Sequence, residues 1–210
     1  MSLQEPTFDD LLHVMATCRS VRKFQDQRVD RTIIQNIVTA GTYASNPRNS
    51  QPWHFVLVDD DKIKAQIADF IAPRAAEVEE AIPRLRTPQK QKMYQDAADL
   101  IRSIGHAPAI IFVCGIEMEY GPGFDSREMI LSATYAAAQN ILVAARAAGV
   151  GAAYTTLHIH ARDQIEKLLE LPKGTNIEVT IPLGYPLKPF GPVNRKHINE
   201  VSSWNSFIPK

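Results

Sequence analysis

A long alanine-rich segment, residues 129–148, constrains the fold of this 210-residue chain more than any other feature. A helix formed by this segment would be largely apolar on every side, whereas a helix on a protein surface has one apolar face and one polar face. The segment is therefore either the central helix of a core or a seam between two chains. We expect it to serve both purposes.

Shorter patterned segments lie on both sides of this helix in the sequence. Apolar residues recur at helical spacing before residue 49 and predict two amphipathic helices, one with Phe8, Leu11, Leu12 and Met15 and one with Ile33, Ile34, Ile37 and Val38. Runs of β-branched and aromatic residues predict strands at 55–58, 109–114, 152–156 and 177–183. Trp53 is predicted to be a core aromatic that opens the first of them. The charged segment 61–105 predicts helices interrupted at Pro73, Pro83 and Pro88.

The charge balance and the cysteines limit the partners and the location. Lysine plus arginine and aspartate plus glutamate both total 23, so the chain has no bulk attraction to nucleic acid or to an anionic membrane. No stretch approaches the roughly 18 apolar residues that span a bilayer. Cys18 and Cys114 are isolated and fit reduced thiols, and the acidic N-terminal segment is unlike a secretory signal. We expect a soluble cytoplasmic protein.

The sequence offers little for other architectures or chemistries. No linker or composition shift divides residues 1–210, which predicts a single domain. The six histidines show no HExxH or paired-ligand spacing, so we expect no metal site. No GxSxG elbow of a hydrolase and no glycine-rich phosphate loop is present.

Two polar segments carry the candidate chemistry. Arg19, Ser20 and Arg22 could direct two guanidinium groups and a hydroxyl at one ligand, and guanidinium forks suit phosphate oxygens and heterocycle carbonyls. The alternative is a solvated basic turn. Asn49 and Gln51 could address one edge of a ligand that alternates C=O and N–H groups, as the pyrimidine half of a flavin does. Here the alternative is that they satisfy their own turn.

Taken together and in order, several segments resemble the nitroreductase family, whose members are FMN-dependent oxidoreductases that work as homodimers. The matching segments are Arg-Ser-Val-Arg-Lys-Phe at 19–24, Asn-Ser-Gln-Pro-Trp at 49–53, the helix end at 139–146, Gly-Val-Gly at 149–151 and Pro-Leu-Gly-Tyr-Pro at 182–186. The resemblance implies an α+β fold of three layers. Its central, mostly antiparallel sheet would be flanked by helices.

The resemblance also implies which residues hold the cofactor. The segment Arg19, Ser20, Val21 and Arg22 would bind the FMN phosphate and the polar edge of the ring. Arg195 would close on the phosphate.

The remaining site residues implied by the resemblance come from two other segments. Asn49 and Gln51 would contact the flavin bound mainly by the partner subunit, and the backbone near Thr156 and Leu157 would face the reactive nitrogen of the ring. No catalytic side chain and no metal is expected, because the flavin carries the chemistry.

By resemblance, the activity is that of an NAD(P)H oxidoreductase. NADH or NADPH would deliver hydride to FMN in a ping-pong cycle, and an electron-poor small molecule such as a nitroaromatic or a quinone would accept the electrons. Flavin destruction, reductive dehalogenation and non-catalytic flavin storage are the alternatives. The sequence names neither the acceptor nor the preferred nucleotide.

The chain also departs from the family pattern. Many relatives carry a second arginine where this chain has Cys18, and we expect Arg195 and Lys196 to compensate for the lost phosphate contact. Ser45-Asn46 replaces a common Pro-Ser pair on the loop beside the flavin. In the family, the region corresponding to residues 61–105 is variable and can cover the active site.

Overall fold

The computed structural model describes residues 7–207. It contains a four-stranded sheet in the order β1-β2-β4-β3, in which all neighbouring strands are antiparallel. The strands are β1 (Trp53–Val58), β2 (Ala109–Ile116), β3 (Gly151–Ala152) and β4 (Thr175–Gly184). The helices are α1 (Phe8–Thr17), α2 (Arg31–Thr42), α3 (Asp61–Ile71), α4 (Pro73–Ala81), α5 (Pro88–Ser103), α6 (Ser126–Ala147), α7 (Arg162–Leu168) and α8 (Ile198–Val201).

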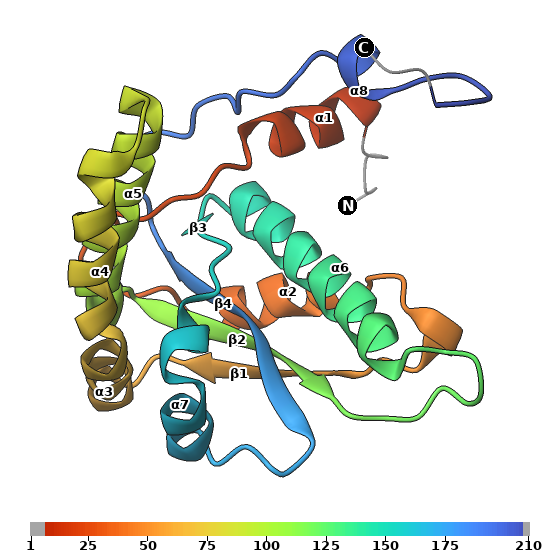
Figure 1. The fold of residues 1–210 in the computed structure, drawn as a ribbon, viewed down its shortest axis with the longest axis horizontal. Helices are drawn as coiled ribbons and strands as arrows, with labels where there is room; N and C mark the ends of the chain where they lie inside the picture. Colours follow the sequence, from red (N-terminus) through yellow and green to blue (C-terminus); the bar gives the residue numbers. More distant parts are fainter. Residues whose placement is uncertain (1–6, 208–210) are drawn as a thin grey trace, which may run out of the picture.

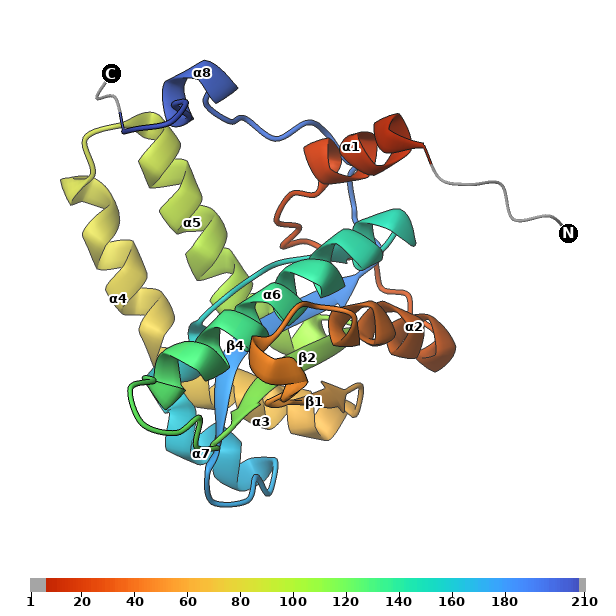
Figure 2. The same cartoon turned by 90° about the vertical axis from the view of Figure 1, so that its right-hand side faces the viewer.

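Helices cover both faces of this sheet, so the fold has three layers (Figures 1 and 2). Side chains of β2 alternate between the two faces, as the pleat of a strand requires. Ile111 packs with α2 and α6 in one core cluster, whereas Phe112 packs with α3, α4, α5 and α7 in the other. The predicted α+β class with an antiparallel central sheet is confirmed. Trp53 opens β1 and is buried, as expected.

The alanine-rich helix is the central element of one of these layers. Its inward face is buried along Ile130, Ala133, Thr134, Ala137, Ala138, Ile141 and Ala145. The helix begins three residues earlier than predicted because the Asp125 side chain accepts a hydrogen bond from the Glu128 N–H and caps it. The core role of this helix is therefore confirmed.

Proline positions explain the divided helical region between β1 and β2. Pro73 and Pro88 each occupy the first position of a helix, where a missing N–H removes no hydrogen bond. The prediction of interrupted helices is confirmed. Short 3-10 turns at Ile82–Arg84 and Ile104–His106 complete the region.

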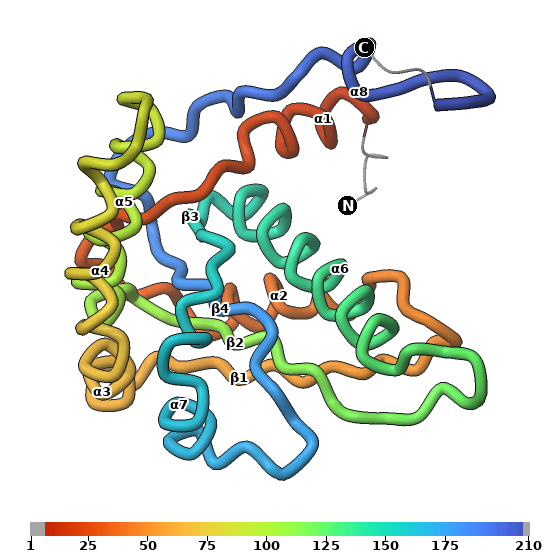
Figure 3. Tube along the Cα trace, viewed as in Figure 1, coloured from red at the N-terminus to blue at the C-terminus, as the bar shows by residue number. Residues whose placement is uncertain are grey.

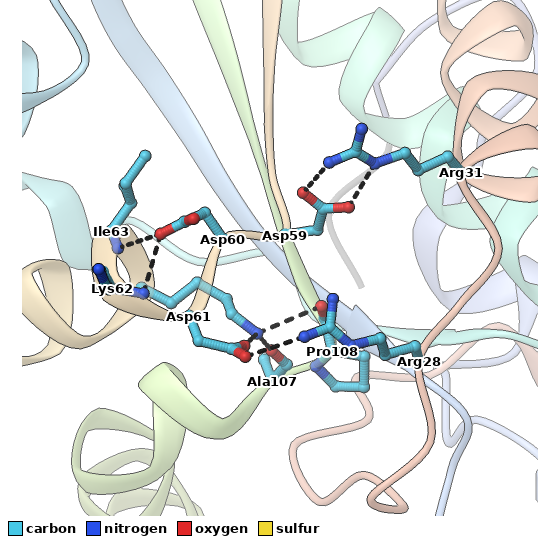
Figure 4. Close-up of polar contacts among 10 residues, drawn as sticks. Arg28, Arg31, Asp59, Asp60, Asp61, Lys62, Ile63, Ala107 and Pro108 are labelled. Atoms are coloured by element: carbon cyan, nitrogen blue, oxygen red, sulfur yellow. Dashed lines mark hydrogen bonds and ion pairs between the residues drawn. The ribbon is translucent and has the colours of Figure 1, made fainter.

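Ion pairs fix α3 to the sheet (Figure 4). Arg31 of α2 forms two hydrogen bonds to Asp59 at the end of β1, and Arg28 pairs with Asp61. The buried Lys64 amino group donates to the Ala107 carbonyl at 2.8 Å and lies 3.0 Å from Asp61. Arg28, Arg31 and Lys64 therefore each have a carboxylate beside them.

The strand predicted at 152–156 is shorter than expected, and this is a correction. β3 ends at Ala152, and Thr155 forms only an isolated bridge to Thr180. Thr155 exchanges backbone hydrogen bonds with Thr180, and its hydroxyl also donates to the Thr180 carbonyl at 2.8 Å, but these contacts do not extend into a regular ladder. Tyr154 is left pointing away from the sheet core and is 37 % exposed.

The C-terminal tail passes the end of α1 and then runs away from it to α8, which lies beside the end of α5 (Figures 2 and 3). The Val193 N–H donates to the Ala16 carbonyl at 2.8 Å and joins the two segments. α1 has no buried residue, although its amphipathic pattern was predicted correctly. Large apolar side chains are exposed on α1, namely Phe8, Leu11, Leu12 and Met15, and a second exposed set follows on α8 and after it, namely Ile198, Val201, Trp204 and Phe207. Within residues 7–207, no helix is long and apolar enough to cross a bilayer.

Candidate functional site

An open cleft of about 1200 Å³ lies between α1, the start of α5, the C-terminal half of α6 and the tail. Four arginines line it: Arg19, Arg22, Arg146 and Arg195. Ser20 adds a hydroxyl, and Tyr154 and Phe190 add aromatic surface. Residues far apart in sequence therefore meet in one place. Three of the four arginines and Ser20 were predicted from the sequence.

The segment 19–22 is extended and pairs with the edge of the sheet. Ser20 bridges Ala152, and the Val21 N–H donates to the Ala152 carbonyl at 2.9 Å. Val21 packs against Gly151, where an added Cβ would lie 2.7 Å from Cγ1 of the valine, so only glycine fits there. Arg19, Ser20 and Arg22 line the cleft, but Val21 is not among the described residues that do so.

The tail brings Arg195 back to the start of the chain. It passes α1 through the Val193–Ala16 hydrogen bond, and Phe190, Pro192 and Asn194 also line the cleft. The Arg195 guanidinium donates one hydrogen bond to the carbonyl of its neighbour Asn194 at 2.9 Å. Arg195 therefore lines the same cleft as Arg19, Ser20 and Arg22, with which the resemblance grouped it. Lys196, expected to assist it, is not among the described residues lining the cleft.

Arg146, near the C-terminal end of α6, was not predicted as a site residue. Its Nε donates to the Thr17 hydroxyl at 2.9 Å, and its guanidinium carbon lies 4.2 Å from the centre of the Phe190 ring. A lone basic residue in the last turn of a helix is typical of a favourable dipole interaction, so the position of Arg146 did not indicate a second role. Only the packing of α1 and the tail reveals it.

The cleft is electrostatically unusual for this molecule. In the part of the chain that the structure describes, none of the four arginines forms a salt bridge, and no aspartate or glutamate lines the cleft. By contrast, Arg28 and Arg31 are both paired with carboxylates (Figure 4). The overall charge of the chain is zero, so this positive field is local. Such an arrangement suits an anionic ligand.

Two other ionisable side chains at the cleft are held neutral. Burial raises the pKa of the Cys18 thiol, and the cations Arg146 and Arg195 oppose that rise without reversing it. Burial also raises the pKa of Tyr154 to about 12. Its ring packs edge-on against Tyr135 at 6.3 Å between centroids. The arginines are thus the only source of formal charge among the described lining residues at neutral pH.

The loop that carries Asn49 and Gln51 lies at the other end of α6 from the cleft arginines (Figure 1). Arg48 stacks over Phe124 and Ser50 bonds Tyr120 at 2.7 Å, both just before α6 begins. With 22 residues, α6 is about 33 Å long. Within one chain, this loop and the cleft are therefore not brought together.

The backbone of this loop is strained. Arg48, Asn49 and Gln51 all have φ near +50°, a backbone conformation that residues other than glycine rarely adopt. The Gln51 N–H donates to the Asn46 side chain at 2.8 Å, which stabilises the turn. The side chains of Asn49 and Gln51 remain exposed. Strain of this kind is often kept for function, so the observation motivates a binding role.

Thr156 and Leu157 follow the shortened strand β3 and begin the 3-10 helix Leu157–Ala161. Thr156 is exposed and Leu157 is half-buried. Neither is among the described residues that line the cleft, although Tyr154, two residues before Thr156, is. Thr156 and Leu157 are thus close in sequence to a residue that lines the cleft, but they do not line it themselves.

The residues present fit the phosphate and the ring of FMN. Guanidinium groups and the Ser20 hydroxyl can donate hydrogen bonds to phosphate oxygens, and Tyr154 and Phe190 offer aromatic surface beside them. A metal ion has less support. Within residues 7–207, no three His, Cys, Asp or Glu side chains gather into a group that could hold one.

Comparisons with known proteins agree with the fold. The model of the nitroreductase family matches residues 16–185. A protein of Methanothermobacter thermautotrophicus, provisionally named NADH dehydrogenase/NAD(P)H nitroreductase, is 29% identical over 180 residues, which are 84% of this chain and 78% of the relative. The iodotyrosine deiodinase of Hydra vulgaris is 28% identical over 210 residues, covering 92% of this chain and 72% of that protein.

A solved structure shares the fold. The crystal structure of an oxidized iodotyrosine deiodinase bound to FMN and 3-iodo-L-tyrosine superposes with a TM-score of 0.74 at 22% identity, and the match covers 94% of this chain and 100% of that chain. The family match spans most of the sequence and includes the segment 19–22, β3 and the end of β4. The chain therefore belongs to the nitroreductase family, a family of oxidoreductase enzymes.

Proposed function

We propose that this protein is a cytoplasmic, FMN-dependent NAD(P)H oxidoreductase that reduces an electron-poor small molecule and works as a homodimer. The observation that carries the proposal is the cleft, in which four arginines face one space without a carboxylate among its described lining residues. A relative named as an NAD(P)H nitroreductase and a neighbour that binds FMN support it. Two free cysteines fit a reducing compartment.

The arginines of the cleft and Ser20 would hold the phosphate. The pairing of residues 19–22 with β3 would keep Arg19, Ser20 and Arg22 in place. FMN, when bound, supplies the redox chemistry by taking hydride from NADH or NADPH and returning electrons to the acceptor. Arg22 would lie toward the polar edge of the ring, where a fixed positive charge favours the reduced cofactor. The backbone at Thr156 and Leu157 would border the ring.

A second copy of the chain would complete the site. Asn49 and Gln51 lie at the far end of α6 from the arginines, so they reach a flavin only if it is bound by a partner. The exposed apolar residues of α1 are the surface we assign to that partner, because Phe8, Leu11, Leu12 and Met15 lie on one short helix that has no buried residue. Neither nucleic acid nor a membrane is proposed as a partner.

Reductive dehalogenation is the second candidate. It is favoured by the deiodinase relative and by the fold neighbour that binds 3-iodo-L-tyrosine. Flavin destruction and flavin storage would use the same cleft. In the storage case, bound flavin would remain oxidised when the nucleotide is added.

Anaerobic reduction tests the proposal. Flavin-loaded protein is mixed with NADH or NADPH and the flavin absorbance is followed, after which a nitroaromatic, a quinone and 3-iodotyrosine are added in turn. We expect rapid bleaching by at least one nucleotide and reoxidation by the nitroaromatic or the quinone. Reoxidation by 3-iodotyrosine alone would support dehalogenation instead. Failure of both nucleotides to bleach the flavin would overturn the enzymatic proposal in favour of storage.

A further inference from the structure

Arg146 holds a fixed orientation at the cleft. One of its five N–H donors, on Nε, is used by the Thr17 hydroxyl at 2.9 Å. Its guanidinium plane lies over the Phe190 ring, with 4.2 Å between the guanidinium carbon and the ring centre. The hydrogen bonds found within residues 7–207 leave its two terminal nitrogens without a protein acceptor. Most of its donors are thus available to a ligand.

The position of Arg146 places this charge beside the Arg-Ser-x-Arg segment. Thr17, its hydrogen-bond partner, is followed directly by Cys18 and then by Arg19 and Ser20. Arg146 and Arg195 line the cleft together with Cys18, and both cations oppose the rise in the pKa of its thiol. Cys18 itself is neutral. Arg146 therefore supplies positive charge beside Cys18, a position that carries none of its own.

A purely structural role is the alternative. Arg146 joins α6, α1 and the tail, and a latch of this kind needs only the Thr17 and Phe190 contacts. However, collecting four cations in one cleft without a carboxylate is unfavourable unless an anion occupies it. A neutral side chain could make the same two contacts without that repulsion. The charge of Arg146 is therefore better explained by a ligand.

We propose that Arg146 is a ligand of the FMN phosphate, oriented for this by Thr17 and Phe190. The proposal rests on the proposed function, because it requires FMN in the cleft. It adds a helix-borne guanidinium to the residues of the 19–22 segment and Arg195. Arginine suits the role because its planar fork can donate two parallel hydrogen bonds to a phosphate while its face stacks on an aromatic ring.

Flavin binding to the flavin-free protein tests this role without relying on activity. Dissociation constants for FMN and for riboflavin, which lacks the phosphate, are measured by fluorescence quenching for the wild type, Arg146→Gln and Arg146→Met. Glutamine can still donate a hydrogen bond to Thr17, and methionine can still lie over Phe190. Each of the two structural contacts is therefore kept in one of the variants, whereas the positive charge is lost in both. We expect FMN to bind each variant at least about tenfold more weakly, with riboflavin nearly unchanged.

Lys62→Gln is the control, because it removes one positive charge from an exposed site on α3. It should leave both constants at their wild-type values. If Arg146→Gln and Arg146→Met keep the wild-type preference for FMN, or lose both flavins equally, Arg146 is not a phosphate ligand and the proposed function stands. If the wild type itself shows no preference for FMN, both the phosphate site and the role of Arg146 are wrong.

Discussion

The Nδ1 atom of His158 lies 2.9 Å from Oγ1 of Thr180, and both side chains are buried. This contact ties the 3-10 helix that begins at Leu157 to the centre of β4. Thr155 reinforces it by exchanging backbone hydrogen bonds of 3.0 Å with Thr180. The segment that leads from β3 past the cleft is thus anchored at two points. Its geometry depends on a histidine that must stay neutral.

His158 should make stability fall in mildly acidic solution. Burial, with smaller effects from Arg162 and His160, lowers its pKa from 6.5 to about 4. Between these values the unfolded state binds more protons than the folded state, so stability is full above pH 6.5 and decreases as the pH falls toward 4. The slope from this group is at most about 1.4 kcal/mol per pH unit.

The measurement is the free energy of unfolding by urea at pH 7 and pH 5. His158→Asn should lose stability at pH 7 but show a weaker pH dependence than the wild type over this window. His54→Asn, on the exposed face of β1, is the control and should keep the wild-type dependence. An unchanged dependence in His158→Asn would show that His158 does not set it.

The ion pair between Arg127 and Glu178 should be asymmetric in its effect on stability. Arg127 at the start of α6 donates two hydrogen bonds to Glu178 of β4; the glutamate side chain is 2% exposed, whereas the arginine side chain is 49% exposed. Arg127→Met leaves a buried carboxylate without its partner and should destabilise by about 3 kcal/mol. Glu178→Gln should destabilise less, because water can reach the arginine. Urea titration of both variants measures this, and the reverse order would contradict it.

Arg22 should set the redox potential of the bound flavin. It lines the cleft and has no salt-bridge partner within residues 7–207. If it lies at the polar edge of the ring, Arg22→Ala removes a charge that favours the reduced cofactor, so the midpoint potential should fall and reduction by NAD(P)H should slow. Lys23→Ala, whose side chain pairs with Asp99 instead, should change neither. If Arg22→Ala binds FMN fully and keeps the wild-type midpoint potential, Arg22 does not lie at the flavin ring.

Association through α1 should be measurable by light scattering. The wild type should scatter as a particle of twice the 23.4 kDa chain mass. Leu11→Asp places a charge on the exposed apolar face of α1 and should weaken the dimer, whereas Leu57→Asp on β1 should not. A stable, flavin-loaded monomer of the wild type at micromolar concentration would contradict the dimer.

Local sequence patterns predicted most of the fold because apolar residues recur along a helix or strand with the period that places them on its buried face. The alanine-rich helix and strands β1, β2 and β4 have strong patterns, and they are within a few residues of their predicted bounds. The prediction of a strand was wrong after Ala152, because only an isolated bridge joins Thr155 to Thr180 beyond that residue. How this segment pairs depends on Thr180, which lies 25 residues further along the chain. No local pattern contains it.

The candidate site was only partly predictable for a similar reason. Arg19, Ser20 and Arg22 are adjacent in sequence, so their shared direction was visible. Arg146 joins them only because α1 and the tail fold over the end of α6. The placement of Asn49 and Gln51 at a partner's flavin is still a prediction.

The central claim is that the cleft binds the phosphate of FMN, and the most direct test compares FMN with riboflavin. The flavin released from the purified protein is identified by chromatography, and both dissociation constants are measured on flavin-free protein. We predict a yellow protein that releases FMN and binds it at least about tenfold more tightly than riboflavin. Equal affinity for the two flavins would contradict the account.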